Sequence, residues 1–169
     1  NIELSNTYFK DDINSPWIFK NAEININKGD FIAIVGESGS GKSTLVDILL
    51  GLLEISKGEL KINEKNIYHN VSYWQSMFAY IPQNIFLMND SILKNITFKD
   101  SINEVDEVKL NLSIKKAQLD KHIRNLDKGI NTTIGDNGIR LSGGQRQRIA
   151  IARAFYFERE IFILDEATN

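Results

Sequence analysis

A glycine-rich loop reads Gly36-Glu37-Ser38-Gly39-Ser40-Gly41-Lys42-Ser43 and lies between two segments of different character. It fits the pattern G-x-x-x-x-G-K-[ST] of a phosphate-binding P-loop. The apolar run 31–35 before it is typical of a buried strand, and residues 43–53 after it are typical of a helix. Glycines let consecutive backbone N–H groups turn toward phosphate oxygens, and the following helix directs its positive end at the same anion. The order strand, loop, helix therefore predicts an α/β nucleotide-binding domain.

The P-loop predicts a specific role for two side chains. We expect Lys42 to reach the β- and γ-phosphates of ATP, and the Ser43 hydroxyl to help hold Mg²⁺. The alternative is a Gly/Ser-rich turn, but four fixed positions match by chance in roughly one chain of this length in a hundred. The nucleotide-binding residues predicted here are Gly36, Glu37, Ser38, Gly39, Ser40, Gly41, Lys42, Ser43 and Thr44.

A second glycine motif, Leu141-Ser142-Gly143-Gly144-Gln145, comes directly before the helix-forming residues 146–154. Ser142 and Gly144 would lie at a helix start, where a hydroxyl and backbone N–H groups face an anion. Because the P-loop already serves the phosphates of this chain's own nucleotide, the second motif suits a phosphate held by another chain.

Two carboxylates, Asp165 and Glu166, follow the apolar residues 161–164. A strand of this composition places them at the carboxyl edge of a sheet, where nucleotide sites of such sheets lie. We expect Asp165 to hold Mg²⁺ and Glu166 to orient and deprotonate the attacking water. An acidic strand end facing solvent is the alternative, which the P-loop disfavours.

Gln83 also ends an apolar strand and is a neutral ligand for Mg²⁺ or water. The alternative is a polar loop residue after Pro82.

In this order, P-loop, LSGGQ and the strand ending in Asp-Glu closely resemble the nucleotide-binding domain of ATP-binding cassette (ABC) proteins, over residues 2–168. The resemblance implies one α/β domain over 1–169, with a P-loop NTPase core, a small antiparallel β subdomain and a helical subdomain inserted at about 84–140. It also implies a catalytic Q-loop at Gln83. Two domains would form a head-to-tail homodimer with two ATP molecules in the interface, contacted by Ser142, Gly143, Gly144 and Gln145.

Two loops resemble those of exporter-type ABC proteins, at residues 86–96 and 133–138. In exporters these loops touch the membrane-spanning part. The resemblance thus implies ATP hydrolysis that drives export, a transmembrane domain on the same full-length chain and a place at the cytoplasmic face of the cell membrane. Two alternatives remain: a soluble ABC ATPase acting on ribosomes or DNA, and an importer subunit whose membrane partner is a separate chain.

Composition restricts the remaining possibilities. The 169 residues are 42% hydrophobic and 25% charged, typical of a globular domain, and a net charge of −2 gives no nucleic-acid-binding signature. Arg146, Arg148 and Arg153 are therefore interpreted as a solvated helix face. The absence of cysteine excludes disulfides and thiolate metal sites. The longest apolar run, 45–53, is too short to span a membrane.

Turn signals separate the expected strands, at 2–4, 24–26, 31–35, 59–62, 78–81 and 161–164. Residues 104–124 are charged, with apolar residues spaced along one helical face, so a single helix is expected there.

The chain departs from the exporter pattern at two places. In exporters an aromatic residue stacks on adenine, and Asp11 occupies the corresponding position in this chain, so Tyr8 or Trp17 is the candidate substitute.

The D-loop would begin at 167–169, and the switch histidine would follow Asn169. His69 and His122 are interpreted as ordinary loop and helix residues. Since residue 1 is Asn with no signal-like segment after it, we expect a piece of a longer polypeptide, incomplete at its C-terminus and inactive in ATP hydrolysis by itself.

Overall fold

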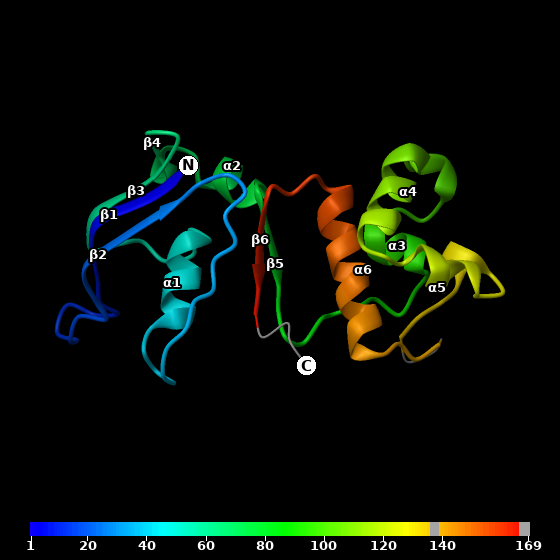
Figure 1. Cartoon of the computed structure of the whole chain (residues 1–169), viewed down its shortest axis with the longest axis horizontal. Helices are drawn as coiled ribbons and strands as arrows, with labels where there is room; N and C mark the ends of the chain where they lie inside the picture. The colour runs from blue at the N-terminus through cyan, green and yellow to red at the C-terminus, as the bar shows by residue number, and fades with distance from the viewer. Residues whose placement is uncertain (136–138, 166–169) are drawn as a thin grey trace. The chain divides into compact units, whose positions relative to one another are not determined.

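The computed structural model describes residues 1–135 and 139–165 of the chain. Within them, helices and strands are mixed, as the α/β prediction requires. The chain forms two compact units, Asn1–Ser76 and Met77–Asn169, and each is described by itself. Figure 1 shows the elements of both units in chain order.

The first unit contains a four-stranded antiparallel sheet in the order β2-β1-β3-β4. Its central strand β1 (Ile2–Phe9) pairs with β2 (Phe19–Ile26) on one side and β3 (Lys57–Ile62) on the other, and β4 is Lys65–Asn66. Leu4 lies opposite Ile24 and Leu60 in this register. Leu4 and Leu60 are fully buried. Alternation along the strands thus places apolar side chains on one face.

The pairing of β1 with β3 is irregular next to the start of β3. The register between β1 and β3 shifts between Ser5 and Tyr8, and Asn6 has a positive φ of 48°. At this point Gly58 of β3 has φ 101°, and a Cβ there would come within 2.5 Å of the Asn6 carbonyl oxygen. Only glycine fits both the backbone angle and the close approach.

The helix after the P-loop, α1 (Lys42–Leu49), is fixed at its C-terminal end by an indole. Trp74 of α2 (Val71–Ser76) donates from Nε1 to the Leu49 carbonyl oxygen at 2.7 Å, and is almost completely buried. A buried N–H needs such an acceptor. The short 3-10 helix η1 (Ile67–His69) leads into α2.

The prediction of a buried strand at 31–35 is wrong for this structure. Those residues form no strand, and Phe31 and Val35 are 93% and 85% exposed. The physical reason is that a strand forms only where its backbone is hydrogen-bonded to a neighbouring strand. The sheet of the first unit ends at β2 and β4, and the described residues 31–35 pair with neither.

In the second unit, β5 (Phe78–Ile81) and β6 (Ile161–Leu164) pair in parallel, with Tyr80 opposite Ile163 and Ile81 opposite Leu164. The helix α6 (Gly143–Tyr156) lies beside them (Figure 1). The rings of Phe155 and Phe162 join α6 to β6 with centroids 5.2 Å apart. The two strands have the bounds that the sequence predicts, 78–81 and 161–164, and the parallel pairing between them is a finding of the structure.

The core of the second unit is a cluster of helices around α6. Helices α3 (Ile92–Thr97) and α4 (Glu107–Lys116) pack against α6, and α5 is Asp120–Arg124. Two 3-10 turns, η2 (Ile102–Glu104) and η3 (Gly129–Asn131), connect them. The buried members of this core are Ile92, Leu93, Ile96, Leu110, Ile114, Ala117, Leu119, Ile123, Ile134, Ile149 and Ala152.

A single helix over 104–124 is also wrong, because the segment breaks after α4. Gln118 has φ 56°, which ends a right-handed helix, and Arg148 Nη1 donates to its carbonyl oxygen at 3.1 Å. Because of this break, Ile114 of α4 and Ile123 of α5 both face the same core. No helix within 1–135 and 139–165 has both the length and the apolar composition to cross a bilayer.

Candidate nucleotide site

The P-loop surrounds the ammonium group of Lys42. Lys42 Nζ donates to the carbonyl oxygens of Gly36 at 2.8 Å and Glu37 at 2.6 Å, so the cation lies within the loop. A turn between Ser40 N–H and the Glu37 carbonyl, 3.2 Å, closes the loop. Gly39 and Gly41 have φ of 79° and 92°, which aim successive N–H groups in directions that most residues do not permit.

The start of α1 leaves its first N–H groups without a capping side chain. Gly41 is the N-cap residue, makes no side-chain cap bond, and the first turn carries no acidic residue. Helices of this kind leave up to four N–H groups for a ligand, and the helix dipole favours an anion. Ser43, in the first turn, is exposed. Together with Lys42, the loop is suited to a polyphosphate.

An aromatic segment packs against the loop from within the same unit. Gly41 lies close to Ile18 and Phe19, since a Cβ there would be 2.8 Å from Ile18 Cγ2. Next to them, the ring of Trp17 meets Tyr8 edge to face, centroids 5.6 Å apart. The Lys10 ammonium lies 4.9 Å from the centroid of the Trp17 ring. Asp11 is exposed. Of the two aromatic candidates, Trp17 directly precedes the residues in contact with the loop.

Parallel pairing of β5 and β6 brings two predicted site residues to one sheet edge in the second unit. Gln83 follows β5 by two residues and Asp165 follows β6 by one, with Asp165 N–H bonded to the Ile81 carbonyl at 3.0 Å. The Tyr80 hydroxyl donates to Asp165 Oδ2, also at 3.0 Å. Glu166, the predicted general base, lies outside the described residues.

The side chains predicted to bind Mg²⁺ carry oxygen atoms, the ligand type that Mg²⁺ prefers. Among the described residues no three His, Asp or Glu side chains come together as a metal cluster. Mg²⁺ is usually held by one or two carboxylates, with waters and substrate phosphates completing its shell. In the second unit, the Asp165 carboxylate and the Gln83 amide carry oxygens of this type, and in the first unit Ser43 carries a hydroxyl.

The LSGGQ motif forms the capped start of α6. Ser142 is the N-cap residue: its Oγ accepts from Gln145 N–H at 3.2 Å, and its own N–H donates to Gln145 Oε1 at 2.8 Å. Ser142, Gly143 and Gly144 are exposed, and a Cβ on either glycine would meet nothing within 4 Å. This capping box leaves the surface over Gly143 and Gly144 open to approach.

Sequence reasoning missed two side chains at these places, Tyr80 and His122. Tyr80 was part of an apolar strand, and only the parallel register shows that its hydroxyl reaches Asp165. His122 was interpreted as an ordinary helix residue. It does lie on α5, but its Nδ1 is 3.2 Å from Gln145 Nε2. No local sequence signal connects residues 23 positions apart.

The two exporter-like loops lie side by side in the second unit. Ser91 and Thr133 form an antiparallel bridge, and Ile134 N–H donates to the Asp90 carbonyl at 2.9 Å. Residues 136–138 of the second loop lie outside the described residues. Asn89 and Thr133 of these segments are exposed, whereas Ile92 and Ile134 are buried in the core.

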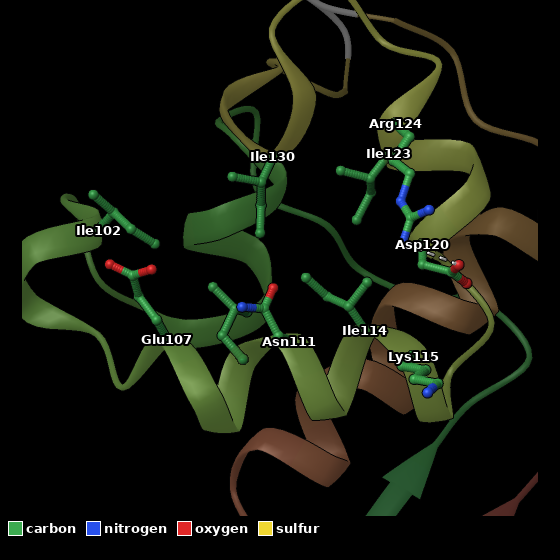
Figure 2. Close-up of a pocket in the computed structure, with 10 residues that line it drawn as sticks. Ile102, Glu107, Asn111, Ile114, Lys115, Asp120, Ile123, Arg124 and Ile130 are labelled. Carbon is green, nitrogen blue, oxygen red and sulfur yellow. Dashed lines mark ion pairs between the residues drawn. The ribbon is translucent and has the colours of Figure 1, made fainter.

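A hollow of about 550 Å³ lies elsewhere in the second unit, between α4, α5 and the 3-10 turns. Figure 2 shows Ile102, Ile114 and Ile130 turned toward it, with the Asp120–Arg124 ion pair at one side, 3.9 Å. None of the predicted site residues lines it.

Comparison with known proteins agrees with these motifs. Residues 19–169 match the family described as ABC transporter. The chain is 40% identical to an ATP-dependent lipid A-core flippase of Coxiella burnetii, over 99% of this chain and 28% of that protein. It is 39% identical to the chloroplastic ABC transporter B family member 29 of Arabidopsis thaliana, over 99% of this chain and 27% of that protein.

A solved structure is also similar, that of a bacterial Atm1-family ABC exporter with ATP bound. Its TM-score is 0.82 at 31% identity, covering 99% of this chain and 29% of that one. This chain thus spans little more than a quarter of the length of these relatives. With a family match over residues 19–169, the chain belongs to the ABC transporter family.

Proposed function

We propose that this chain is the ATP-binding and ATP-hydrolysing motor domain of an exporter-type ABC transporter. The observation that carries the proposal is the P-loop: the Lys42 ammonium lies within it, and α1 begins without a capping side chain. Such a site binds the β- and γ-phosphates of ATP. The similarity to an exporter with ATP bound supports the same nucleotide. Trp17 is proposed as the adenine contact.

Hydrolysis would be catalysed by positioning and electrostatics, with little covalent chemistry from the protein. Ser43, Gln83 and Asp165 would hold Mg²⁺, which would neutralise charge that develops on the transferred phosphoryl group. Glu166 would orient and deprotonate the attacking water, and Gln83 would assist at the same edge. The hydrogen bond from Tyr80 limits the positions that Asp165 takes.

The exposed capping box of α6 supports a second copy as partner. Ser142, Gly143 and Gly144 would contact the ATP bound to the other copy, so that two domains pair head to tail with ATP between them. The serine hydroxyl accepts from Gln145 and still has its own proton to donate to a phosphate oxygen.

The paired loops at 89–92 and 132–135 support a transmembrane partner, on the same full-length chain at the cytoplasmic face of a membrane. The similarity to a lipid A-core flippase and to a solved ABC exporter favours this over an importer or a ribosome- or DNA-linked ATPase. Within the single domain 1–169, residues 84–140 are proposed as the inserted helical subdomain, and the antiparallel sheet of the first unit as the β subdomain.

The test is ATP turnover by the full-length protein with and without Mg²⁺, for the wild type and for Ser142→Arg. We expect turnover that needs Mg²⁺, and loss of turnover and of ATP-dependent dimerisation in the variant. ATP affinity of the variant should equal that of the wild type, because its P-loop is intact. Mg²⁺-independent turnover, or a variant that still dimerises with ATP, would contradict the proposal.

A further inference from the structure

The side chain of Gln145 lies between the start of α6 and a histidine on another helix. Its Oε1 accepts from the Ser142 N–H at 2.8 Å, and its Nε2 is 3.2 Å from Nδ1 of His122. A backbone N–H is only a donor, so the amide atom facing Ser142 is oxygen. The amide NH₂ therefore faces His122, and Nδ1 of the imidazole must accept.

This geometry determines the tautomer of His122. With Nδ1 accepting, the proton is on Nε2. A doubly protonated ring would put two donors 3.2 Å apart, so only the neutral imidazole fits. The Nε2 atom is buried and has no hydrogen-bond partner among the described residues.

A buried N–H without a hydrogen-bond acceptor lowers the stability of the folded protein, because its bond to water is lost and not replaced. An apolar side chain at 122 would avoid this cost, and the neighbouring Ile123 is already part of the core. Packing alone therefore does not account for a histidine here. A buried polar group of this kind needs an explanation, and among the described residues the ring has its polar contact with Gln145.

We infer that His122 is a positioning residue for the LSGGQ motif. Its neutral imidazole holds the Gln145 amide in the orientation that completes the capping box of α6. The capping box in turn fixes Ser142, Gly143 and Gly144. The inference rests on the proposed function, in which those three residues contact the ATP of the second copy.

The first experiment compares His122→Phe with His122→Asn in the full-length protein. Phe keeps a flat ring but removes the acceptor, whereas the Asn amide places an acceptor near the position of Nδ1. We expect His122→Phe to lower ATP turnover by about two- to tenfold, the worth of one net hydrogen bond. His122→Asn should recover most of the turnover, and ATP affinity should change in neither. His69→Phe, the same substitution on η1, is the control and should change nothing.

A double-mutant cycle tests whether His122 acts through Gln145. Once Gln145→Ala has removed the amide, adding His122→Phe should lower turnover no further. If His122→Phe lowers turnover by the same factor in the Gln145→Ala background as in the wild type, the inference is overturned. It is also overturned if turnover by His122→Asn is no higher than turnover by His122→Phe.

Ser142→Arg separates this inference from the proposed function on which it rests. If Ser142→Arg abolishes turnover while His122→Phe leaves it unchanged, the positioning role is wrong and the proposed function stands. If Ser142→Arg leaves turnover intact, the proposed function of the motif is wrong, and the inference is overturned with it.

Discussion

The Tyr80 hydroxyl donates a hydrogen bond to Oδ2 of Asp165 at 3.0 Å, between neighbouring parallel strands. Tyr80 lies opposite Ile163, and Asp165 follows Ile163 by two residues, so the two side chains share one face of the sheet. The sequence predicts Asp165 as a Mg²⁺ ligand, and this bond determines which of its oxygens has a protein donor. A phenol thus orients the carboxylate without adding charge.

Tyr80→Phe tests this relationship. Loss of a neutral hydrogen bond costs about 0.5–1.5 kcal/mol. We expect the Mg²⁺ concentration for half-maximal ATP turnover to rise by about two- to tenfold, with the maximal rate at saturating Mg²⁺ little changed. Tyr73→Phe removes an exposed hydroxyl on α2 and serves as the control. An unchanged Mg²⁺ dependence in Tyr80→Phe would mean that the bond does not orient Asp165 for the metal.

Lys42→Ala should abolish tight binding of Mg-ATP. The ammonium already lies in the P-loop, and hydrogen bonds from a charged group are worth about 1.5–3 kcal/mol each. Affinity should therefore fall by about ten- to a hundredfold or more, measured by nucleotide titration of the full-length protein. Lys28→Ala removes an exposed lysine of the same unit and should bind ATP normally. Normal affinity in Lys42→Ala would remove this residue from the site.

Glu166→Gln should bind ATP normally but almost stop hydrolysis, because an amide cannot accept the proton of the attacking water. We expect an ATP-bound dimer to accumulate, visible as an increase in mass by light scattering. The same substitution at Glu160, just before β6, should leave turnover unchanged. Hydrolysis at the normal rate by Glu166→Gln, without an accumulated dimer, would contradict the assignment.

Trp17→Ala should lower the affinity for ATP without lowering the affinity for inorganic triphosphate. Stacking of a base on an aromatic ring is worth about 1–3 kcal/mol, so ATP affinity should fall by about five- to a hundredfold. Triphosphate lacks the base and should compete equally well for both proteins. If both ligands weaken together, Trp17 acts by packing against Tyr8 and the loop, and does not contact adenine.

Local patterns in the sequence predicted the elements whose partners are close or repetitive. The strands at 78–81 and 161–164 follow from short apolar runs, and the run before Asp165 predicts this residue at the carboxyl edge of a sheet. The parallel register then brings Gln83 to the same edge. The start of α6 at the LSGGQ motif was likewise predictable from the helix-forming residues that follow it, whereas the capping box between Ser142 and Gln145 is a structural finding. The roles of these residues in ATP hydrolysis stay predictions.

The rest depends on contacts that the sequence does not encode locally. The apolar residues 31–35 have the composition of a buried strand, but Phe31 is exposed because no neighbouring strand pairs with them. The break between α4 and α5 occurs at Gln118, which has a positive φ although it is neither a glycine nor a proline. No residue typical of a helix end therefore marks this position in the sequence. His122 became relevant only when the fold brought it to Gln145.

Gly41→Ala and Gly39→Ala separate backbone strain from close packing in the P-loop. Both glycines have a positive φ, 79° at Gly39 and 92° at Gly41, so alanine at either position costs about 1–2 kcal/mol in backbone energy. A Cβ at Gly39 meets nothing within 4 Å, whereas one at Gly41 would lie 2.8 Å from Ile18 Cγ2 and 3.1 Å from the Phe19 ring.

Gly41→Ala must therefore also displace Ile18 or the start of α1, and overpacking of this kind costs about 1–3 kcal/mol more. We expect the thermal midpoint of the nucleotide-free full-length protein to fall further in Gly41→Ala than in Gly39→Ala. Since the displaced segment carries Trp17, Gly41→Ala should also lose more affinity for ATP than for triphosphate. Equal midpoints in the two variants would show that the segment at 17–19 does not pack against the loop in solution, and that the adenine contact must be sought elsewhere.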